Sequence, residues 1–282
     1  MTEILSCIYD SLKGVYPVQE VTSFTHLIME KVCNVPSHKL LFGKDTEISA
    51  IEKDEIKDIV ERLKRYEPIQ YILGQTEFYN QKFLLDPSAL IPRPETEELV
   101  GRIIKDYEGK TPAFLDVGTG SGCIAVTLGK YFPESKIIAV DISNAALRLA
   151  VKNAKLHKVK IDYLNYDILN ALPNDKTIPF GLDVIVSNPP YVTYGEMPFM
   201  DRNVVDYEPS EALFVEDADP LKFYRHIARF GKRKLCRGGR IYAEINSRYG
   251  KEIFELFRKE RYKKIEVFKD MSRRDRFVKA EL

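Results

Sequence analysis

Apolar residues in the first quarter of the chain recur at the spacing of an α-helix. Between residues 48 and 67 they return at three, four and related offsets, with charged residues between them. The positions are Ile48, Ile51, Ile56, Ile59, Val60 and Leu63. We expect these side chains to share one buried helix face, and Glu67-Pro68 to end the helix. Residues 4–12 and 18–32 show similar patterns, so a small N-terminal all-α domain is predicted over residues 1–74.

A different pattern joins this domain to the rest of the chain. Residues 75–95 read QTEFYNQKFLLDPSALIPRPE, where aromatic and aliphatic residues interleave with polar ones around Asn80-Gln81. Prolines follow at positions 87, 92 and 94. A hairpin followed by an extended connector is the simplest interpretation, and we place this linker at residues 75–94.

Patterns typical of strands and helices alternate regularly after the linker. The expected strands are 113–117, 136–141, 161–167, 182–187 and 239–245. The expected helices are 123–131, 143–157, 220–235 and 251–259. Such alternation predicts right-handed crossovers and a mostly parallel sheet covered on both faces.

The last two expected strands, 265–268 and 277–280, are separated by a short charged segment that contains MSRRDR. That segment is too short for a helical crossover, so the two strands should pair antiparallel. The predicted fold class is therefore α/β, a doubly wound and mostly parallel sheet with an antiparallel C-terminal strand, beside the N-terminal helices. In such a sheet the fourth strand lies next to the first. The α/β domain is expected to span residues 95–282.

Composition and charge exclude several classes of protein. Lysine and arginine total 43 and aspartate and glutamate total 42, so there is no global positive field, and no stable nucleic-acid partner is expected. The four cysteines and four histidines lack metal-ligand spacing, so no metal is expected. The N-terminus lacks a signal-peptide pattern, and no stretch approaches about 18 consecutive apolar residues. We expect a cytoplasmic monomer with no membrane association.

A glycine-rich turn, DVGTGSG at residues 116–122, follows the first strand of the α/β domain. Glycines there let the backbone turn tightly and approach a ligand at the carboxyl edge of the sheet. The next strand ends in Asp141, whose carboxylate can accept both hydroxyls of a ribose. A nicotinamide dinucleotide site would need a further glycine where this chain has Cys123. The spacing instead resembles the S-adenosylmethionine (SAM) motif of class I methyltransferases, although a glycine turn without a ligand stays open.

Asp167 ends the third strand of the domain, and Ile168 follows it. In the methyltransferase fold that the turn resembles, an acid at this place commonly faces the adenine amino group, and the next residue flanks the base. A plain helix cap is the alternative for Asp167, because aspartate is a common N-cap. The candidate cofactor-binding residues are Gly118, Thr119, Gly120, Ser121, Gly122, Asp141, Asp167, Ile168 and Asn188.

The fourth strand ends in VSNPPY, residues 186–191, where two prolines remove two backbone donors in succession. The side-chain oxygen of Asn188 and the carbonyl oxygen of Pro189 can accept the two N–H bonds of a carboxamide or an exocyclic amine. These contacts would aim the nitrogen at a methyl donor and stabilise the positive charge that develops on it. Tyr191 would stack on the planar group. The candidate catalytic residues are Asn188, Pro189, Pro190 and Tyr191, unless the motif is only a stiff turn.

Asn-Pro-Pro-Tyr occurs in DNA adenine methyltransferases, in some ribosomal RNA guanine methyltransferases and in protein glutamine methyltransferases. Upstream, PIQYILG at 68–74, Phe78 and LIPRPETE at 90–97 are similar to the release-factor glutamine methyltransferases in particular. EPSEAL at 208–213 and RDR at 274–276 match the same family. With the order of domains, the resemblance covers nearly the whole chain.

The resemblance implies a class I SAM-dependent methyltransferase. Its substrate would be the glutamine in the Gly-Gly-Gln loop of class 1 peptide-chain release factors, methylated on the side-chain amide nitrogen, N5. The resemblance also implies that Arg93, Glu95 and Thr96 line the pocket, with a capping box at the start of helix 95–104 as the alternative or an additional role. The chain departs from the family at 215–220, VEDADP for GG-x-DG, and at Asn246, where the family often has glycine.

Two other functions stay open from the sequence. The same NPPY motif fits an enzyme that methylates an exocyclic amino group of a base in ribosomal RNA or DNA. A binding module that keeps the fold without turnover is the other. The N-terminal domain, which contains none of the site motifs, is expected to recognise the body of the release factor.

Overall fold

The computed structural model of the protein describes residues 2–36, 38, 47–172 and 176–282. Residues 1, 37 and 39–46 of the predicted N-terminal domain lie outside the described residues. The chain divides into two units. The first comprises Met1–Gly74 and Asp201–Tyr207, and the second comprises Gln75–Met200 and Glu208–Leu282.

The first unit is made of helices. Its helices are α1 (Thr2–Leu12), α2 (Val18–Cys33), α4 (Ala50–Lys64), α5 (Ile69–Leu73) and α9 (Arg202–Val205). Helix α4 begins with a capping box in which Ser49 and Glu52 satisfy each other's backbone N–H groups. From α4, four predicted core residues are buried against α1 and α2: Ile56, Ile59, Val60 and Leu63.

The prediction that Ile51 shares this buried face is wrong, because its side chain is 80% exposed. Ile51 and Ile56 are five residues apart, which is about 140° around an α-helix, so the two side chains point in different directions. Ile48 precedes the helix, whose N-cap is Ser49. The helix also ends at Lys64, before the predicted Glu67-Pro68 boundary, and Pro68 instead precedes α5.

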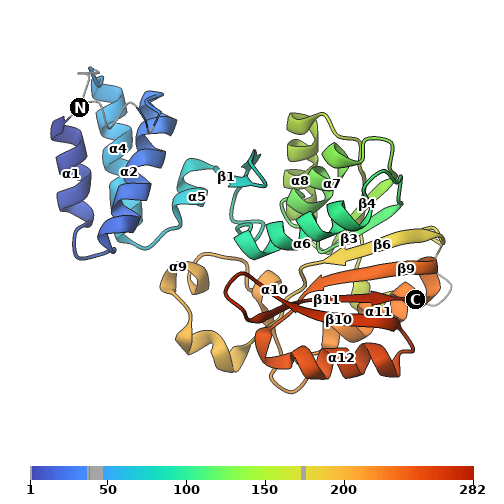
Figure 1. Ribbon diagram of the computed structural model, residues 1–282. Coiled ribbons are helices and arrows are strands. Elements are labelled where there is room, and N and C mark those ends of the chain that lie inside the picture. Colours follow the sequence, from blue (N-terminus) through green and yellow to red (C-terminus); the bar gives the residue numbers. More distant parts are fainter. Residues whose placement is uncertain (1, 37, 39–46, 173–175) are drawn as a thin grey trace. The chain divides into compact units, whose positions relative to one another are not determined.

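The second unit is built on a seven-stranded sheet with the order β10-β11-β9-β6-β3-β4-β5 (Figure 1). Its strands are β3 (Phe114–Val117), β4 (Ile137–Asp141), β5 (Asp162–Asn165), β6 (Leu182–Ser187), β9 (Leu235–Glu244), β10 (Lys263–Lys269) and β11 (Asp275–Glu281). The pairs from β9 to β5 are parallel, and β11 is antiparallel to both of its neighbours. The predicted positions of β6 beside β3 and of the antiparallel last pair are confirmed.

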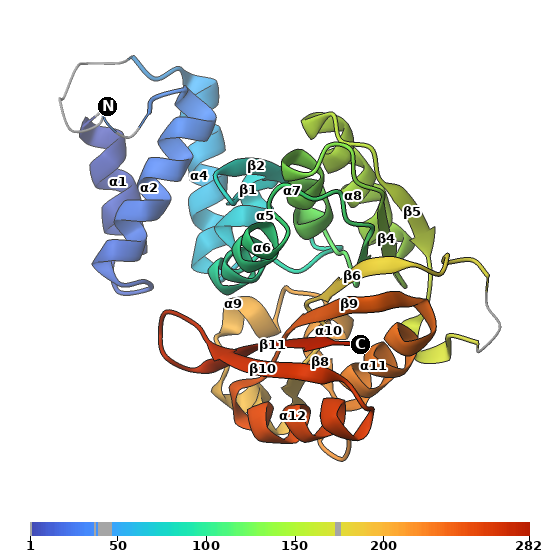
Figure 2. The same ribbon diagram turned by 45° about the vertical axis from the view of Figure 1, so that its right-hand side comes forward.

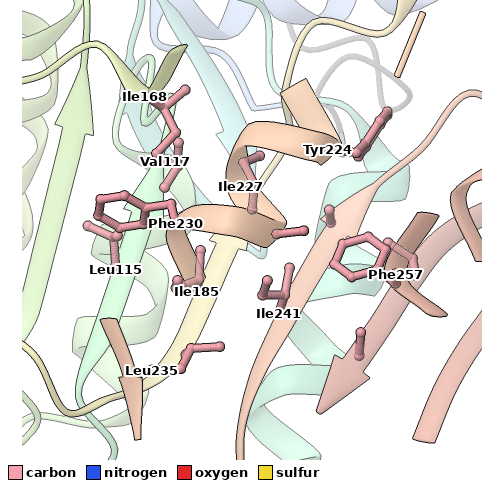
Figure 3. Packing of buried hydrophobic residues seen from close by; sticks show 14 of the residues in the cluster. Leu115, Val117, Ile168, Ile185, Tyr224, Ile227, Phe230, Leu235, Ile241 and Phe257 are labelled. Carbon is pink, nitrogen blue, oxygen red and sulfur yellow. The ribbon is translucent and has the colours of Figure 1, made fainter. Parts of the chain in front are cut away.

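Helices cover both faces of this sheet (Figure 2). The helices on one face are α6 (Pro94–Asp106), α7 (Cys123–Tyr131) and α8 (Asn144–His157), and those on the other are α11 (Lys222–Lys234) and α12 (Gly250–Lys259). Successive strand residues alternate between the two cores, as the period of a β-strand requires. Leu115 packs with Ile227 and Phe230 of α11, as Figure 3 shows, whereas Phe114 belongs to the core under α6 and α7.

Short elements complete the second unit. The predicted linker hairpin is present as β1 (Gln75–Phe78) and β2 (Gln81–Leu84), joined through Tyr79 and Asn80 at positive φ. The sequence did not predict a further group of short elements: η1 (Ile168–Asn170), β7 (Val192–Thr193), η2 (Tyr194–Phe199), α10 (Ser210–Leu213), β8 (Phe214–Val215) and η3 (Ser247–Tyr249). In the part of the chain that the structure describes, no helix combines the length and apolarity needed to span a bilayer.

Candidate active site

A cavity of about 300 Å³ opens at the carboxyl ends of the central parallel strands, where open α/β sheets bind ligands. Its walls come from the second unit alone. The predicted site residues that line it are Gly118, Thr119, Gly120, Ser121, Asp141, Asp167, Ile168, Asn188, Pro189 and Pro190. Gly122 and Tyr191 are not among the lining residues.

Asp141 is held in place by the glycine turn of the neighbouring strand. Its Oδ2 atom accepts a hydrogen bond of 2.9 Å from the N–H of Gly120, and its Oδ1 atom accepts one of 2.9 Å from the N–H of Ser143. Burial raises the pKa of Asp141, while these backbone donors act in the opposite direction. Each carboxylate oxygen keeps a second lone pair, so the fixed carboxylate can still accept two ligand hydroxyls.

The glycines of the turn serve two different purposes. Gly118 has a φ of 73°, and a Cβ atom added there would meet no protein atom within 4 Å, because the position lines the cavity. Gly122 has a φ of 80°, but a Cβ atom there would lie 3.0 Å from the Cβ atom of Ala150 in α8. Gly118 therefore leaves room for a ligand, whereas Gly122 lets α7 and α8 approach each other.

Asp116, at the end of β3, lies behind the turn and is completely buried. The hydroxyl of Thr119 donates to its Oδ2 atom at 2.6 Å. Burial raises the pKa of Asp116 to about 7, and the neighbouring Asp141 carboxylate adds to the rise. The turn thus covers the buried Asp116 and, through the N–H of Gly120, holds Asp141 at the cavity.

Asp167 forms the helix cap that the sequence left as its alternative role. Its Oδ1 atom accepts a hydrogen bond of 2.8 Å from the N–H of Leu169, at the start of η1. Its Oδ2 atom accepts one of 2.7 Å from the side chain of Asn170. Asp167 and the buried Ile168 also line the cavity, so the cap fixes this part of the wall.

Asn188 follows β6, beside the glycine turn that follows β3. Its Nδ2 atom donates to the Oγ1 atom of Thr96 at 3.2 Å. Among the described residues, no protein group donates a hydrogen bond to the Oδ1 atom of Asn188 or to the carbonyl oxygen of Pro189. Two acceptors of the NPPY motif are therefore available to a ligand in or next to the cavity.

Tyr191, which is not among the lining residues, is anchored through its hydroxyl and its backbone. Its hydroxyl donates to the Oε1 atom of Glu244 at 2.8 Å, and its carbonyl oxygen accepts a hydrogen bond of 3.1 Å from the side chain of Asn246. Asn246 also donates to Glu196 at 2.9 Å. The departure from the family's usual glycine at Asn246 thus adds contacts that hold the segment after the motif.

Of Arg93, Glu95 and Thr96, which the resemblance places at the pocket, only Thr96 lines the cavity. Arg93 donates to the Oε1 atom of Glu208 at 2.5 Å, and Glu208 also accepts the N–H of Ile91 at 3.1 Å. The capping box that the sequence left open as an alternative is not formed, because α6 begins at Pro94 and its N-cap, Arg93, makes no side-chain capping bond. The hydroxyl of Thr96 instead donates to Glu244.

Sequence reasoning did not assign roles to Glu208 or Glu244. Glu208 opens the EPSEAL segment, whose sequence indicates a family resemblance but no role for this side chain. Glu244 ends the buried strand β9, and its side chain is 1% exposed. An acidic residue at the end of an apolar run, in GRIYAEI, is the signal that could have drawn attention to it, because buried carboxylates need partners.

The arrangement suits group transfer to a polar nitrogen. A largely apolar cavity with a fixed carboxylate can hold a nucleoside, and the pair of acceptors after β6 can orient a planar –NH₂ group. Within residues 2–36, 38, 47–172 and 176–282, no group of three or more His, Cys, Asp or Glu side chains is placed to hold a metal ion.

Two family models match the chain, the Methyltransferase small domain over residues 96–203 and the PrmC N-terminal domain over residues 3–74. The chain is 42% identical over 280 residues to the release factor glutamine methyltransferase of Bacteroides thetaiotaomicron, with 99% of both chains covered. It is 41% identical over 274 residues to that of Flavobacterium psychrophilum, covering 96% of this chain and 95% of the relative. A solved methyltransferase from Pyrococcus furiosus shares the fold, with a TM-score of 0.53 and 17% identity over 80% of this chain and 98% of that one.

Proposed function

The chain belongs to the family of release factor glutamine methyltransferases, and on this premise we propose how its own residues carry out the reaction. It transfers a methyl group from SAM to N5 of the glutamine in the Gly-Gly-Gln loop of class 1 peptide-chain release factors. The observation that supports this most strongly is the pair of available acceptors, Asn188 Oδ1 and the Pro189 carbonyl oxygen, at the cavity edge.

The residues at the cavity fit SAM. Asp141 would accept the ribose hydroxyls, since both of its oxygens are fixed by backbone N–H groups and keep a free lone pair. Ile168 would flank the adenine, and Asp167 would face its amino group from the wall. Gly118 leaves the space in which a ligand can approach the backbone. When bound, SAM supplies an electrophilic methyl group on sulfur and leaves as a neutral thioether.

The NPPY motif acts on the acceptor nitrogen. The Oδ1 atom of Asn188 and the carbonyl oxygen of Pro189 accept the two N–H bonds of the glutamine carboxamide and turn its nitrogen toward the methyl group. Both oxygens are partial negative charges, so their interaction strengthens as the nitrogen becomes cationic in the transition state. The proton then leaves the cationic nitrogen, and no strong general base is needed. Tyr191 supports the planar group by stacking.

The direct test is transfer of labelled methyl from SAM to an unmodified release factor. We expect label on the wild-type factor and none on a factor whose Gly-Gly-Gln glutamine is changed to alanine. Undiminished labelling of the altered factor would show that the substrate assignment is wrong. Labelled RNA or DNA in parallel reactions would support the alternative, a base N-methyltransferase, which the net charge of +1 disfavours.

The first unit is proposed to recognise the body of the release factor, because the cavity and the NPPY motif belong entirely to the second unit. Removing residues 1–74 should then raise KM for the whole factor more than for a short Gly-Gly-Gln peptide. Thermal unfolding of the truncated protein checks that the second unit still folds. Equal increases in KM for both substrates contradict this role.

We infer that the protein acts in the cytoplasm, where release factors act on the ribosome. A monomer suffices for the proposed chemistry, since every residue assigned to it comes from one chain. Sedimentation at assay concentration tests this, and activity confined to a dimer would contradict it.

A further inference from the structure

Glu244 places a buried carboxylate between two hydroxyl groups that come from distant parts of the chain. The hydroxyl of Thr96, in α6, donates to its Oε2 atom at 2.7 Å. The hydroxyl of Tyr191, after β6, donates to its Oε1 atom at 2.8 Å. A carboxylate has no proton to give, so both hydroxyls must direct their single proton toward it.

The direction of the hydrogen bond from Thr96 to Glu244 decides how the side-chain amide of Asn188 is oriented. With its proton committed to Glu244, the oxygen of Thr96 can only accept from any other partner. The side-chain atom of Asn188 that lies 3.2 Å from this oxygen must therefore be its NH₂ group. The nitrogen and oxygen of an asparagine amide are otherwise hard to distinguish, and here the neighbouring hydrogen bonds settle which is which. The Oδ1 atom of Asn188 is then the end left for a ligand.

Two hydroxyl donors and a nearby cation favour the ionised form of Glu244. Burial raises its pKa, while the hydrogen bonds from Thr96 and Tyr191 and the charge of Arg276 act in the opposite direction. The hydroxyl of Tyr224 donates to the backbone carbonyl of Glu244 at 3.0 Å, which fixes the end of β9. The carboxylate is thus held by both its backbone and its side chain.

We propose that Glu244 is a positioning residue for methyl transfer, which through Thr96 fixes the amide of Asn188 with its oxygen toward the substrate nitrogen. This role rests on the proposed function. If the amide of Asn188 were reversed, its NH₂ group would face the N–H bonds of the carboxamide. Two donors would then oppose each other, and the acceptor that stabilises the cationic nitrogen would be lost.

Glu244→Gln is the informative substitution, because it keeps the shape and removes the capacity to accept from both hydroxyls. When the NH₂ group of the new amide faces Thr96, the Thr96 hydroxyl loses its acceptor and can donate to Asn188, whose amide then reverses. We expect kcat on a Gly-Gly-Gln peptide to fall about 10- to 100-fold, the effect of one hydrogen bond to a charged group. KM for the peptide should change less than kcat, since the contact concerned is strongest in the transition state.

The hydrogen bonds from Asn188 to Thr96 and from Thr96 to Glu244 form a relay, and variants of Thr96 separate the effect of this relay from that of packing. Thr96→Val keeps the volume but removes the hydroxyl, and it should lower kcat as much as Glu244→Gln does. Thr96→Ser keeps the hydroxyl and should retain kcat within about threefold. Glu281→Gln is the matched control, because Glu281, at the C-terminal end of β11, also accepts from two side chains, Arg240 at 3.0 Å and Lys264 at 2.7 Å. Its kcat should equal that of the wild type.

A double-mutant cycle with Asn188→Ala decides whether Glu244 acts through Asn188. In the Asn188→Ala background, adding Glu244→Gln should cost less than about threefold in kcat, because the amide that it orients is already absent. A merely structural role for Glu244 predicts the full loss in both backgrounds. Equal losses in the two backgrounds would overturn the proposal.

A second measurement keeps the relay testable without turnover. In protein grown on isotope-labelled asparagine, the side-chain amide resonance of Asn188, identified by its loss in Asn188→Ala, should shift in Glu244→Gln and Thr96→Val. It should not shift in Thr96→Ser or Glu281→Gln. If release factors are not methylated but the shift is seen, the proposed function fails and the relay stands. If they are methylated but the resonance stays unchanged in both Glu244→Gln and Thr96→Val, the relay fails alone.

Discussion

Alanine substitutions at Gly122 and Gly118 of the same turn are expected to impair different properties, the first mainly stability and the second mainly SAM binding. Gly122→Ala must adopt a φ of 80° and place its Cβ atom 3.0 Å from that of Ala150. The left-handed backbone costs about 1–2 kcal/mol and overpacking about 1–3 kcal/mol, while reduced unfolded-state entropy offsets about 0.4–1 kcal/mol. The second unit should therefore lose about 1–4.6 kcal/mol of unfolding free energy.

Gly118→Ala is the matched variant, with a similar φ of 73° but no protein atom within 4 Å of the added Cβ atom. Its stability loss should be limited to the backbone strain less the same entropic offset, about 0–1.6 kcal/mol. The added methyl group enters the cavity, so SAM should bind at least about tenfold more weakly, equivalent to about 1.4 kcal/mol.

Urea unfolding measures the first effect and titration calorimetry with SAM measures the second. The reasoning predicts that Gly122→Ala has the lower urea midpoint and that Gly118→Ala is folded but deficient in binding. An unchanged midpoint in Gly122→Ala would refute the packing role, and wild-type SAM affinity in Gly118→Ala would refute the position of the cofactor.

Three further predictions concern stability, each measured as the urea midpoint. The pKa of Asp116 is about 7 in the folded protein, above its usual 3.8, so the stability that its protonated form contributes is present below pH 3.8 and is lost as the pH rises through about 7. The urea midpoint of Asp116→Asn should therefore depend less on pH than that of the wild type. An unaltered pH dependence of the midpoint would count against this. Arg93→Ala leaves the buried carboxylate of Glu208 without its cation and should lower the unfolding free energy by about 1–3 kcal/mol, a range reduced for solvent screening because the Arg93 side chain is 30% exposed. The same loss in a Glu208→Gln background would disprove the pairing. Ile56→Ala should cost about 2–4 kcal/mol and the exposed Ile51→Ala less than about 0.5 kcal/mol, and equal losses would mean that the helix face is misassigned.

The class I methyltransferase fold predicted from the sequence is confirmed, and the reason is local. Each long element has a clear period, and the glycine turn and NPPY motif mark strand ends that chain topology brings together. Helix α7 has the predicted bounds, Cys123–Tyr131, because Gly122 at positive φ precedes it. Two-residue strands such as β7 are too short for any period to be visible.

Interactions between distant residues could not be predicted in this way. Thr96 and Glu244 are 148 positions apart, so no pattern along the chain connects their side chains. The error at Ile51 has a different cause, because its spacing fits a run of isoleucines, whereas its angle of about 140° from Ile56 around the helix turns it away from the core. The glycine turn held a similar ambiguity, since spacing alone could not separate the ligand-facing Gly118 from the helix-packing Gly122.

A structure of the protein with the demethylated cofactor product and a Gly-Gly-Gln peptide tests the central claim most directly. The account predicts that the glutamine amide nitrogen lies about 2.7–3.2 Å from both Asn188 Oδ1 and the Pro189 carbonyl oxygen, facing the cofactor sulfur. A glutamine held by other groups, or an Asn188 amide nitrogen pointing at the substrate, would contradict it.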